Sequence, residues 1–206
     1  MSTPLLRRLV AEFIGTALLV IFGPGSVVAA LKVGNGELDY GGLGFIALAF
    51  GIVVAVVIYG FGAVSGAHIN PAVTFTLAVT RRFPLVEVLP YMITQLLGGA
   101  AGGLLVVAIF SREAVSLGGA GSTVLAPGVS VGAGLGAEAI GTFILVFAIM
   151  AVAVDARAPK EMAGLMIGLA VTLAIVVVGP LTGASLNPAR TFDPYVASAF
   201  FGGSPP

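Results

Sequence analysis

The chain has 206 residues, of which 58% are hydrophobic and only 9% are charged. Soluble domains carry about 25% charged residues, because charge keeps their surface wetted. The composition therefore excludes a soluble protein and predicts an integral membrane protein. The formal net charge is zero, which gives no indication of a nucleic-acid partner, and a sequence without Cys excludes disulfides and thiolate chemistry.

Five apolar runs are long enough to cross a membrane, since about 20 apolar residues span roughly 30 Å of hydrocarbon. They predict membrane-spanning helices at about 9–31, 42–64, 86–110, 131–154 and 162–180. In lipid, the backbone is satisfied only within helices or closed barrels, and the alternating pattern of a barrel strand is absent. The first run is too long for a signal-peptide core, so we interpret it as a retained span.

Two further segments contain an Asn-Pro dipeptide, "SGAHINPAVT" (65–74) and "TGASLNPART" (182–191). Each leads into a helix-compatible stretch, about 71–80 and 188–199, and ten residues at 1.5 Å each reach only about halfway across the hydrocarbon. Asn is a favoured helix cap and Pro a favoured first helical residue. We therefore expect Asn70-Pro71 and Asn187-Pro188 to start half-helices at membrane depth.

The two halves of the chain are similar to each other. "AEFIGTALLVIF" (11–22) matches "AEAIGTFILVFA" (137–148) at seven of twelve positions, and the two Asn-Pro segments match at six of ten. An odd number of spans per half makes the halves face opposite ways, as in transport proteins whose sites lie at the midplane. This predicts one domain of 1–206, with a first repeat at about 5–110 and an incomplete second repeat at about 131–206.

The two half-helix starts are expected to meet near the middle of the membrane. Each carries roughly half a positive charge from its free backbone amides, and each cap Asn can donate N–H groups to a passing oxygen. A narrow passage at this point orients water by its oxygen and raises the energy of any cation or hydronium. The Asn-Pro segments therefore predict the centre of a pore.

Basic residues in the loops predict the orientation of the chain. Six fall on one side of the membrane and two, Lys32 and Arg112, on the other; the six are Arg7, Arg8, Arg81, Arg82, Arg157 and Lys160. The side richer in Lys and Arg is normally cytoplasmic. We therefore expect a multi-pass protein of a cell membrane with a cytoplasmic N-terminus.

Taken together, these motifs resemble the aquaporins, the water and glycerol channels of the major intrinsic protein family, over about Leu6 to Tyr195. "VDARAP" (154–159) and "LNPARTF" (186–192) are most similar to microbial members, including archaeal ones. The resemblance implies an all-α membrane protein with an aquaporin-like inverted repeat, five full transmembrane helices and two half-helices meeting at the midplane. It implies pore motifs at Asn70, Pro71, Ala72, Asn187, Pro188 and Ala189.

The resemblance also implies a selectivity constriction formed by Phe50, Ile175, Ala184 and Arg190. Pore-lining carbonyls are expected at Gly66, Ala67, His68, Ile69, Gly183, Ala184 and Ser185. Ile175 occupies the position that is His in strict water channels and Gly in glycerol facilitators, so the constriction should be less polar than in a strict water channel. Thr191 stands where the facilitators typically have Asp. We expect a passive channel for water that excludes protons and ions, with permeability to glycerol left open.

The chain departs from the family pattern at two places. Asp193 stands where the family usually has Gly; it either pairs with Arg190 and weakens the cation barrier, or lies in the outer vestibule, which we favour. The family also has a sixth span after the second half-helix, which "ASAFFGGSPP" cannot supply. We favour a truncated reading of a longer gene over a channel that lacks a wall.

Several polar or small residues have both a structural and a functional interpretation. Glu12 and Glu138 lie inside spans, where a charged residue usually has a function. They could form a proton relay, but we favour a role as hydrogen-bond acceptors for the backbone amides before the half-helices. His68 is either a pH gate or, as favoured, a fixed polar group that holds the first loop. The doublets at 98–99 and 102–103 indicate close helix packing, within the chain or between subunits. A homotetramer is implied by the resemblance only.

Other classes of function are less consistent with the sequence. One His and no Cys offer no metal cluster and no nucleophile–base pair, which argues against an enzyme, and no cofactor is expected. The expected partners are water, small neutral solutes and the lipid bilayer. Two alternatives stay open: a proton-coupled transporter that uses Glu12 or Glu138, and a non-conducting truncated channel homologue.

Overall fold

The computed structural model describes residues 3–201, and five of its helices are long and apolar enough to cross a membrane. They are α1 (Leu5–Val33), α2 (Tyr40–Ser65), α4 (Leu85–Phe110), α6 (Val131–Ala148) continued by η1 (Ile149–Val154), and η2 (Lys160–Met162) continued by α7 (Ala163–Thr182). These helices confirm the five predicted spans to within a few residues. The end of the predicted second repeat, residues 202–206, lies outside the described part of the chain.

The two half-helices, α3 (Pro71–Val79) and α8 (Pro188–Phe201), begin at the predicted prolines. Two details were not predicted. A short helix, α5 (Glu113–Gly118), follows α4, and the last turns of the fourth span, η1, are a π-helix. π-Helical turns inside α-helices are rare and frequently occur at functional sites.

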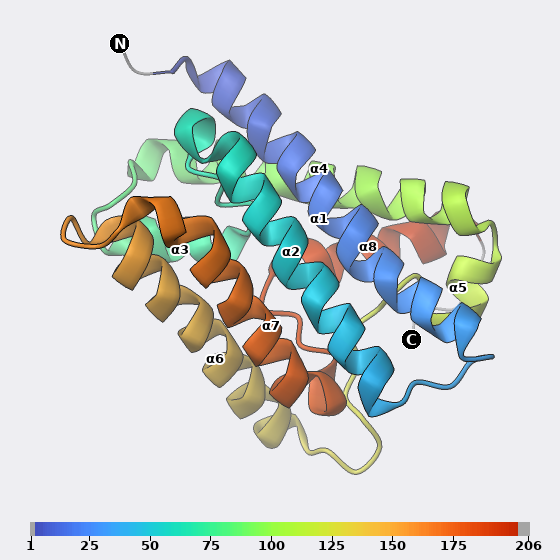
Figure 1. Cartoon of the computed structure of the whole chain (residues 1–206). Coiled ribbons are helices and arrows are strands. Elements are labelled where there is room, and N and C mark those ends of the chain that lie inside the picture. The colour runs from blue at the N-terminus through green and yellow to red at the C-terminus, as the bar shows by residue number, and fades with distance from the viewer. Residues whose placement is uncertain (1–2, 202–206) are drawn as a thin grey trace.

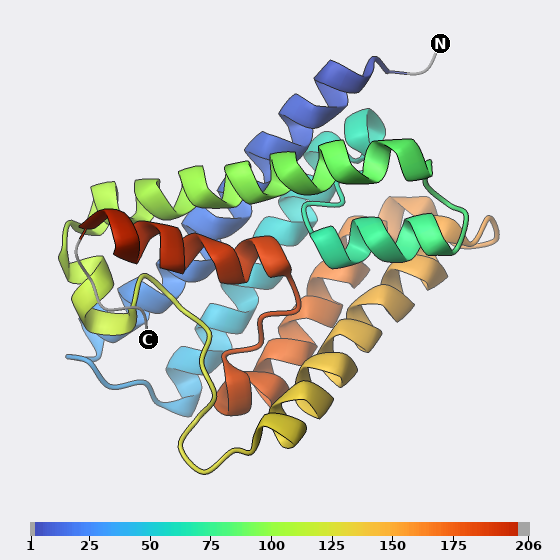
Figure 2. The same cartoon turned by 180° about the vertical axis from the view of Figure 1, so that it is seen from behind.

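The long helices pack against one another as a bundle, and the two half-helices lie along one of them, α4. α1 packs against α2 and α4, α2 packs along α7, and α6 covers the outer side of α7 (Figure 1). Seen from behind, α4 runs alongside both half-helices, with α8 (red) beside one part of it and α3 (teal) beside the other (Figure 2). One long helix therefore supports both short ones, and the loops that precede α3 and α8 lie inside the bundle.

Small residues on α4 allow this close approach. A Cβ atom at Gly99 would lie 2.8 Å from the carbonyl oxygen of Ala189, and one at Gly103 would lie 3.0 Å from that of Asp193. On the other face, a Cβ atom at Gly102 would lie 2.7 Å from the carbonyl oxygen of Ala17 in α1. The glycine doublets thus serve packing within the chain, holding α8 on one face of α4 and α1 on the other.

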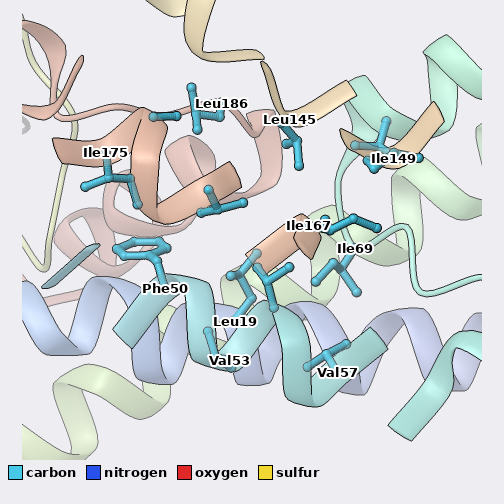
Figure 3. Packing of buried hydrophobic residues seen from close by; sticks show 14 of the residues in the cluster. Leu19, Phe50, Val53, Val57, Ile69, Leu145, Ile149, Ile167, Ile175 and Leu186 are labelled. Carbon is cyan, nitrogen blue, oxygen red and sulfur yellow. The ribbon is translucent and has the colours of Figure 1, made fainter. Parts of the chain in front are cut away.

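The core is apolar and gathers side chains from both halves of the chain. Figure 3 shows residues of α2 and α7, such as Val53 and Ile167, directed toward the same region as Leu145 and Ile149. Large apolar side chains also cover the outside of the bundle; on α6 they are Val131, Leu135, Ile140, Phe143 and Phe147. Exposed apolar area of this extent suits lipid rather than water.

Candidate functional site

The starts of the two half-helices have the same cap geometry. The side-chain oxygen of Asn70 accepts a hydrogen bond from the backbone N–H of Ala72 at 2.8 Å, and that of Asn187 accepts from Ala189 at 3.0 Å. In each helix Pro occupies the first helical position, where its missing N–H costs nothing. These are the caps that the Asn-Pro dipeptides predict.

The two cap residues also bind each other's loops. The Nδ2 atom of Asn70 donates to the carbonyl oxygen of Leu186 at 2.8 Å, and Nδ2 of Asn187 donates to the carbonyl oxygen of Ile69 at 2.8 Å. Residues 116 to 118 positions apart in the sequence are thereby joined. The reciprocal pair fixes the two half-helix starts against each other in the centre of the bundle.

The loops before the half-helices have an unusual backbone. After the left-handed caps Gly66 and Gly183, the residues Ala67, Ile69, Ala184 and Leu186 have φ between 44° and 53°. Left-handed backbone is uncommon for residues with a Cβ, and it persists only where the surroundings impose it. In both loops the surroundings include a glutamate side chain that accepts hydrogen bonds from the loop.

Glu12 holds the first loop. Its Oε1 atom accepts from the Ser65 hydroxyl at 2.6 Å and from the backbone N–H of His68 at 3.0 Å. Its Oε2 atom accepts from the backbone N–H of Ile69 at 2.7 Å and from Nε2 of Gln95 at 2.8 Å. Four donors on one fully buried carboxylate favour the acceptor interpretation of Glu12 over the proton-relay interpretation.

Glu138 holds the second loop with fewer bonds. Oε1 accepts from the Thr182 hydroxyl at 2.5 Å and from the backbone N–H of Ser185 at 2.8 Å. Oε2 accepts from the backbone N–H of Leu186 at 2.9 Å. The acceptor interpretation is therefore favoured here as well, but Glu138 is only partly buried, and among residues 3–201 the only side chain that donates to it is that of Thr182.

His68 lies in a cluster of polar and aromatic side chains, of which the sequence analysis predicted only His68 itself. The Nδ1 atom of His68 lies 3.1 Å from the Thr74 hydroxyl, and its ring lies 4.8 Å from that of Phe83 and 5.3 Å from that of Tyr91, centroid to centroid. The Tyr91 hydroxyl donates to the carbonyl oxygen of Ser65 at 2.9 Å. These contacts fit a fixed group in the first loop. Gln95, which the sequence analysis missed, was visible as an uncharged polar side chain inside a span.

A cavity of about 750 Å³, here called the pore cavity, passes between the half-helix starts. It extends from Phe50 and Arg190, past Asn70 and Asn187, to residues near the end of α2 and the start of α7. Of the predicted carbonyl residues, Gly66, Ala67, His68, Ile69, Ala184 and Ser185 line it, whereas Gly183 is not among its lining residues. Apolar side chains of several helices form most of its wall, including Val54 of α2, Leu145 of α6, and Ile167 and Val171 of α7.

The four predicted constriction residues come together at one end of the pore cavity. Phe50, Ile175, Ala184 and Arg190 all line it, and Figure 3 shows Phe50 beside Ile175. The Arg190 guanidinium carbon lies 5.2 Å from the centroid of the Phe50 ring. Nη1 of Arg190 donates to the carbonyl oxygen of Gly121 at 2.6 Å, a partner that the sequence analysis missed.

Asp193 does not lie where the sequence analysis placed it. Its side chain is 0% exposed and does not line the pore cavity, so the vestibule interpretation is wrong. Within the described residues its carboxylate forms no ion pair with Arg190 either. The cause is the packing of α8 on α4, which places Asp193 against Gly103.

Two basic residues stand at the opposite end of the pore cavity. Arg82 and Lys160 line it, and Nζ of Lys160 donates at 2.7 Å to the carbonyl oxygens of both Ala153 and Asp155, at the end of η1. Hydrogen bonds from the side chain and backbone of Arg157 lower the pKa of Asp155 to about 2. The Asp155 carboxylate is therefore ionised at neutral pH.

Comparison with known proteins agrees with this geometry. The family model described as Major intrinsic protein matches residues 1–202. The chain belongs to the major intrinsic protein family. As the family assignment implies, it is a multi-pass membrane protein of the aquaporin channel type.

Individual members of the family are similar over nearly the whole chain. A probable aquaporin AqpM of Archaeoglobus fulgidus is 47% identical, over 98% of this chain and 87% of the relative. The aquaporin AqpM of Methanothermobacter marburgensis is 45% identical, over 97% of this chain and 87% of the relative. The solved structure of the aquaglyceroporin from Plasmodium falciparum has a TM-score of 0.85 at 26% identity, over 97% of this chain and 84% of that one. The expected resemblance to the family, and to its archaeal members, is confirmed.

Proposed function

We propose that the chain is a passive channel that conducts water and small neutral solutes such as glycerol through the pore cavity, and that it excludes protons and ions. The observation that carries the proposal is the pair of crossed bonds, Asn70 to Leu186 and Asn187 to Ile69, beside a continuous cavity. The channel domain consists of the two repeats at about 5–110 and 131–206. It assembles as a homotetramer in a cell membrane, with its N-terminus in the cytoplasm.

The half-helix starts give the selectivity against cations. An amide side chain has two N–H donors, and each cap Asn uses one of them on the opposite loop. The second is available to the oxygen of a passing water. The positive ends of α3 and α8 favour the same orientation of water and raise the energy of a cation or hydronium at this point.

The constriction gives the selectivity for size and polarity. Phe50, Ile175 and Ala184 offer apolar walls, and Arg190 offers N–H donors on one side. A small polyol has carbon–hydrogen and hydroxyl faces that match these two kinds of wall, and water needs only the donors. The constriction therefore favours water together with small neutral solutes over charged ones.

The transport is passive, because both candidate proton carriers are engaged elsewhere. Glu12 accepts four hydrogen bonds and Glu138 accepts three, and together these bonds hold the loops that shape the pore cavity. A carboxylate that exchanges protons with a solute would have to break these hydrogen bonds in each transport cycle. Channels of this family are not enzymes, and the proposed partners are limited to permeating solutes, lipid and further copies of the chain.

The test is osmotic shrinkage of liposomes that contain the full chain, followed by light scattering at several temperatures. A channel gives faster shrinkage than in empty liposomes, with a weak temperature dependence and no response to an imposed pH gradient. Shrinkage no faster than in empty liposomes would favour a non-conducting homologue. Solute uptake that follows the pH gradient would favour a proton-coupled transporter.

A further inference from the structure

Asp193 is a buried acidic group that the pore itself does not use. It lies in α8, one helical turn after Arg190, and neither of its carboxylate oxygens has a hydrogen-bond partner within the described residues. It is fully buried and outside the lining of the pore cavity. A buried carboxylate without donors is costly unless an opposite charge compensates it.

Arg190 supplies that opposite charge. Residues three apart on a helix face the same side, with Cβ atoms about 5–6 Å apart. Arg190 is 2% exposed, one of its guanidinium nitrogens donates to the carbonyl oxygen of Gly121, and its Nε atom has no partner within the described residues. A donor without an acceptor and an acceptor without donors, counted among the described residues, thus stand one turn apart on α8.

We infer that Asp193 is the counter-charge of Arg190 and a specificity-determining residue, which sets the ion selectivity of the constriction without contacting the solute. The inference rests on the proposed function. With Asp193 ionised, the two groups have a net charge near zero, so this constriction repels cations less than a lone arginine would. The barrier against cations then depends largely on the positive starts of α3 and α8.

The test compares potassium and nitrate leak through the full chain in liposomes, for the parent and for Asp193→Asn. Removal of the negative charge leaves Arg190 uncompensated, so potassium leak falls and nitrate leak rises. The potassium-to-nitrate ratio is expected to fall about tenfold, equivalent to about 1.4 kcal/mol. Asp193→Gly should show the same change, because charge and not side-chain shape is responsible. A ratio equal to that of the parent in both variants would overturn the inference.

A matched control and a second background separate charge from packing. Ser198→Ala removes a second buried polar group of α8, which has no hydrogen-bond partner among the described residues, and should leave the ratio unchanged. In an Arg190→Val background the lone carboxylate attracts cations, and adding Asp193→Asn should reverse the resulting potassium leak. No reversal would contradict a charged Asp193. Osmotic shrinkage of the same liposomes tests the proposed function. If the parent conducts water but the potassium-to-nitrate ratio does not change in the variants, only this inference is overturned. If the parent conducts nothing, both are overturned.

Discussion

The starts of α3 and α8 share a frame but differ in the polar groups attached to it. In both, a left-handed Gly precedes the loop, a cap Asn crosses to the opposite loop, and a glutamate accepts the loop amides. The third residue of the helix is Val73 in one and Arg190 in the other, and the sixth is Thr76 in one and Asp193 in the other.

The hydrogen-bond network around the glutamate is larger at the start of α3, the half-helix without the charged residues. Glu12 is fully buried and accepts from Gln95, which also donates to Thr74 at 2.9 Å. Within the described part of the chain, Glu138 has no side-chain partner besides Thr182. The start of α3 is therefore held by more hydrogen bonds, and α8 carries the charged residues Arg190 and Asp193. The comparison indicates that one repeat serves mainly to fix the pore and the other to select among solutes.

The largest expected effect is on stability, and it should be unequal between the two glutamates. In Glu12→Gln the new NH2 group replaces the oxygen that accepts from Ile69 and Gln95, so both donors lose their acceptor. At roughly 1–3 kcal/mol for each donor, the free energy of unfolding should fall by about 2–6 kcal/mol. In Glu138→Gln the corresponding oxygen serves one donor, Leu186, which gives about 1–3 kcal/mol. Thermal unfolding in detergent, followed by circular dichroism, measures both.

The exposed Glu37 provides the control for these variants, since Glu37→Gln should change stability by no more than about 0.5 kcal/mol. Equal losses for Glu12→Gln and Glu138→Gln would show that the two loops are held alike, contrary to the difference described above.

The second effect is on ion leak. Arg190→Val gives α8 the residue that α3 already has at this position, and it removes the donor side of the constriction while leaving the carboxylate of Asp193. Potassium leak should rise about 10- to 100-fold, which corresponds to roughly 1.4–2.7 kcal/mol. Liposomes loaded with a potassium-sensitive dye report the rate. A variant as ion-tight as the parent would refute the role given to Arg190.

The smallest effect concerns solute preference. Ile175→His turns one apolar wall of the constriction into a hydrogen-bonding one, so glycerol flux should fall more than water flux. A threefold drop in their ratio, on the order of 0.7 kcal/mol, is expected from paired shrinkage assays. Ile167→His, eight residues earlier on α7 and also in the pore cavity, should change the two fluxes in proportion. The constriction model fails if Ile175→His does the same.

The features that depend on local sequence could be predicted. Apolar runs of the right length identified the spans, and Asn-Pro identified where Pro71 and Pro188 start the half-helices. Features set by distant segments could not. Gly121 is adjacent to Arg190 only because of the path of the loop between α5 and α6, and Asp193 is buried only because Gly103 admits α8 onto α4. The π-helical end of the fourth span has no distinct apolar pattern.

The central claim is that water passes between the half-helix starts, and a cysteine pair tests it directly, because the chain has no Cys of its own. Val73→Cys places a thiol in the pore cavity, where residue 73 is 4% exposed, and Phe75→Cys places one on the outer face of the same helix, where residue 75 is 56% exposed. A bulky, reducible thiol reagent should slow osmotic shrinkage of Val73→Cys liposomes at least fivefold and leave Phe75→Cys unaffected, and a reductant should restore it. Full water permeability of fully modified Val73→Cys would contradict the account.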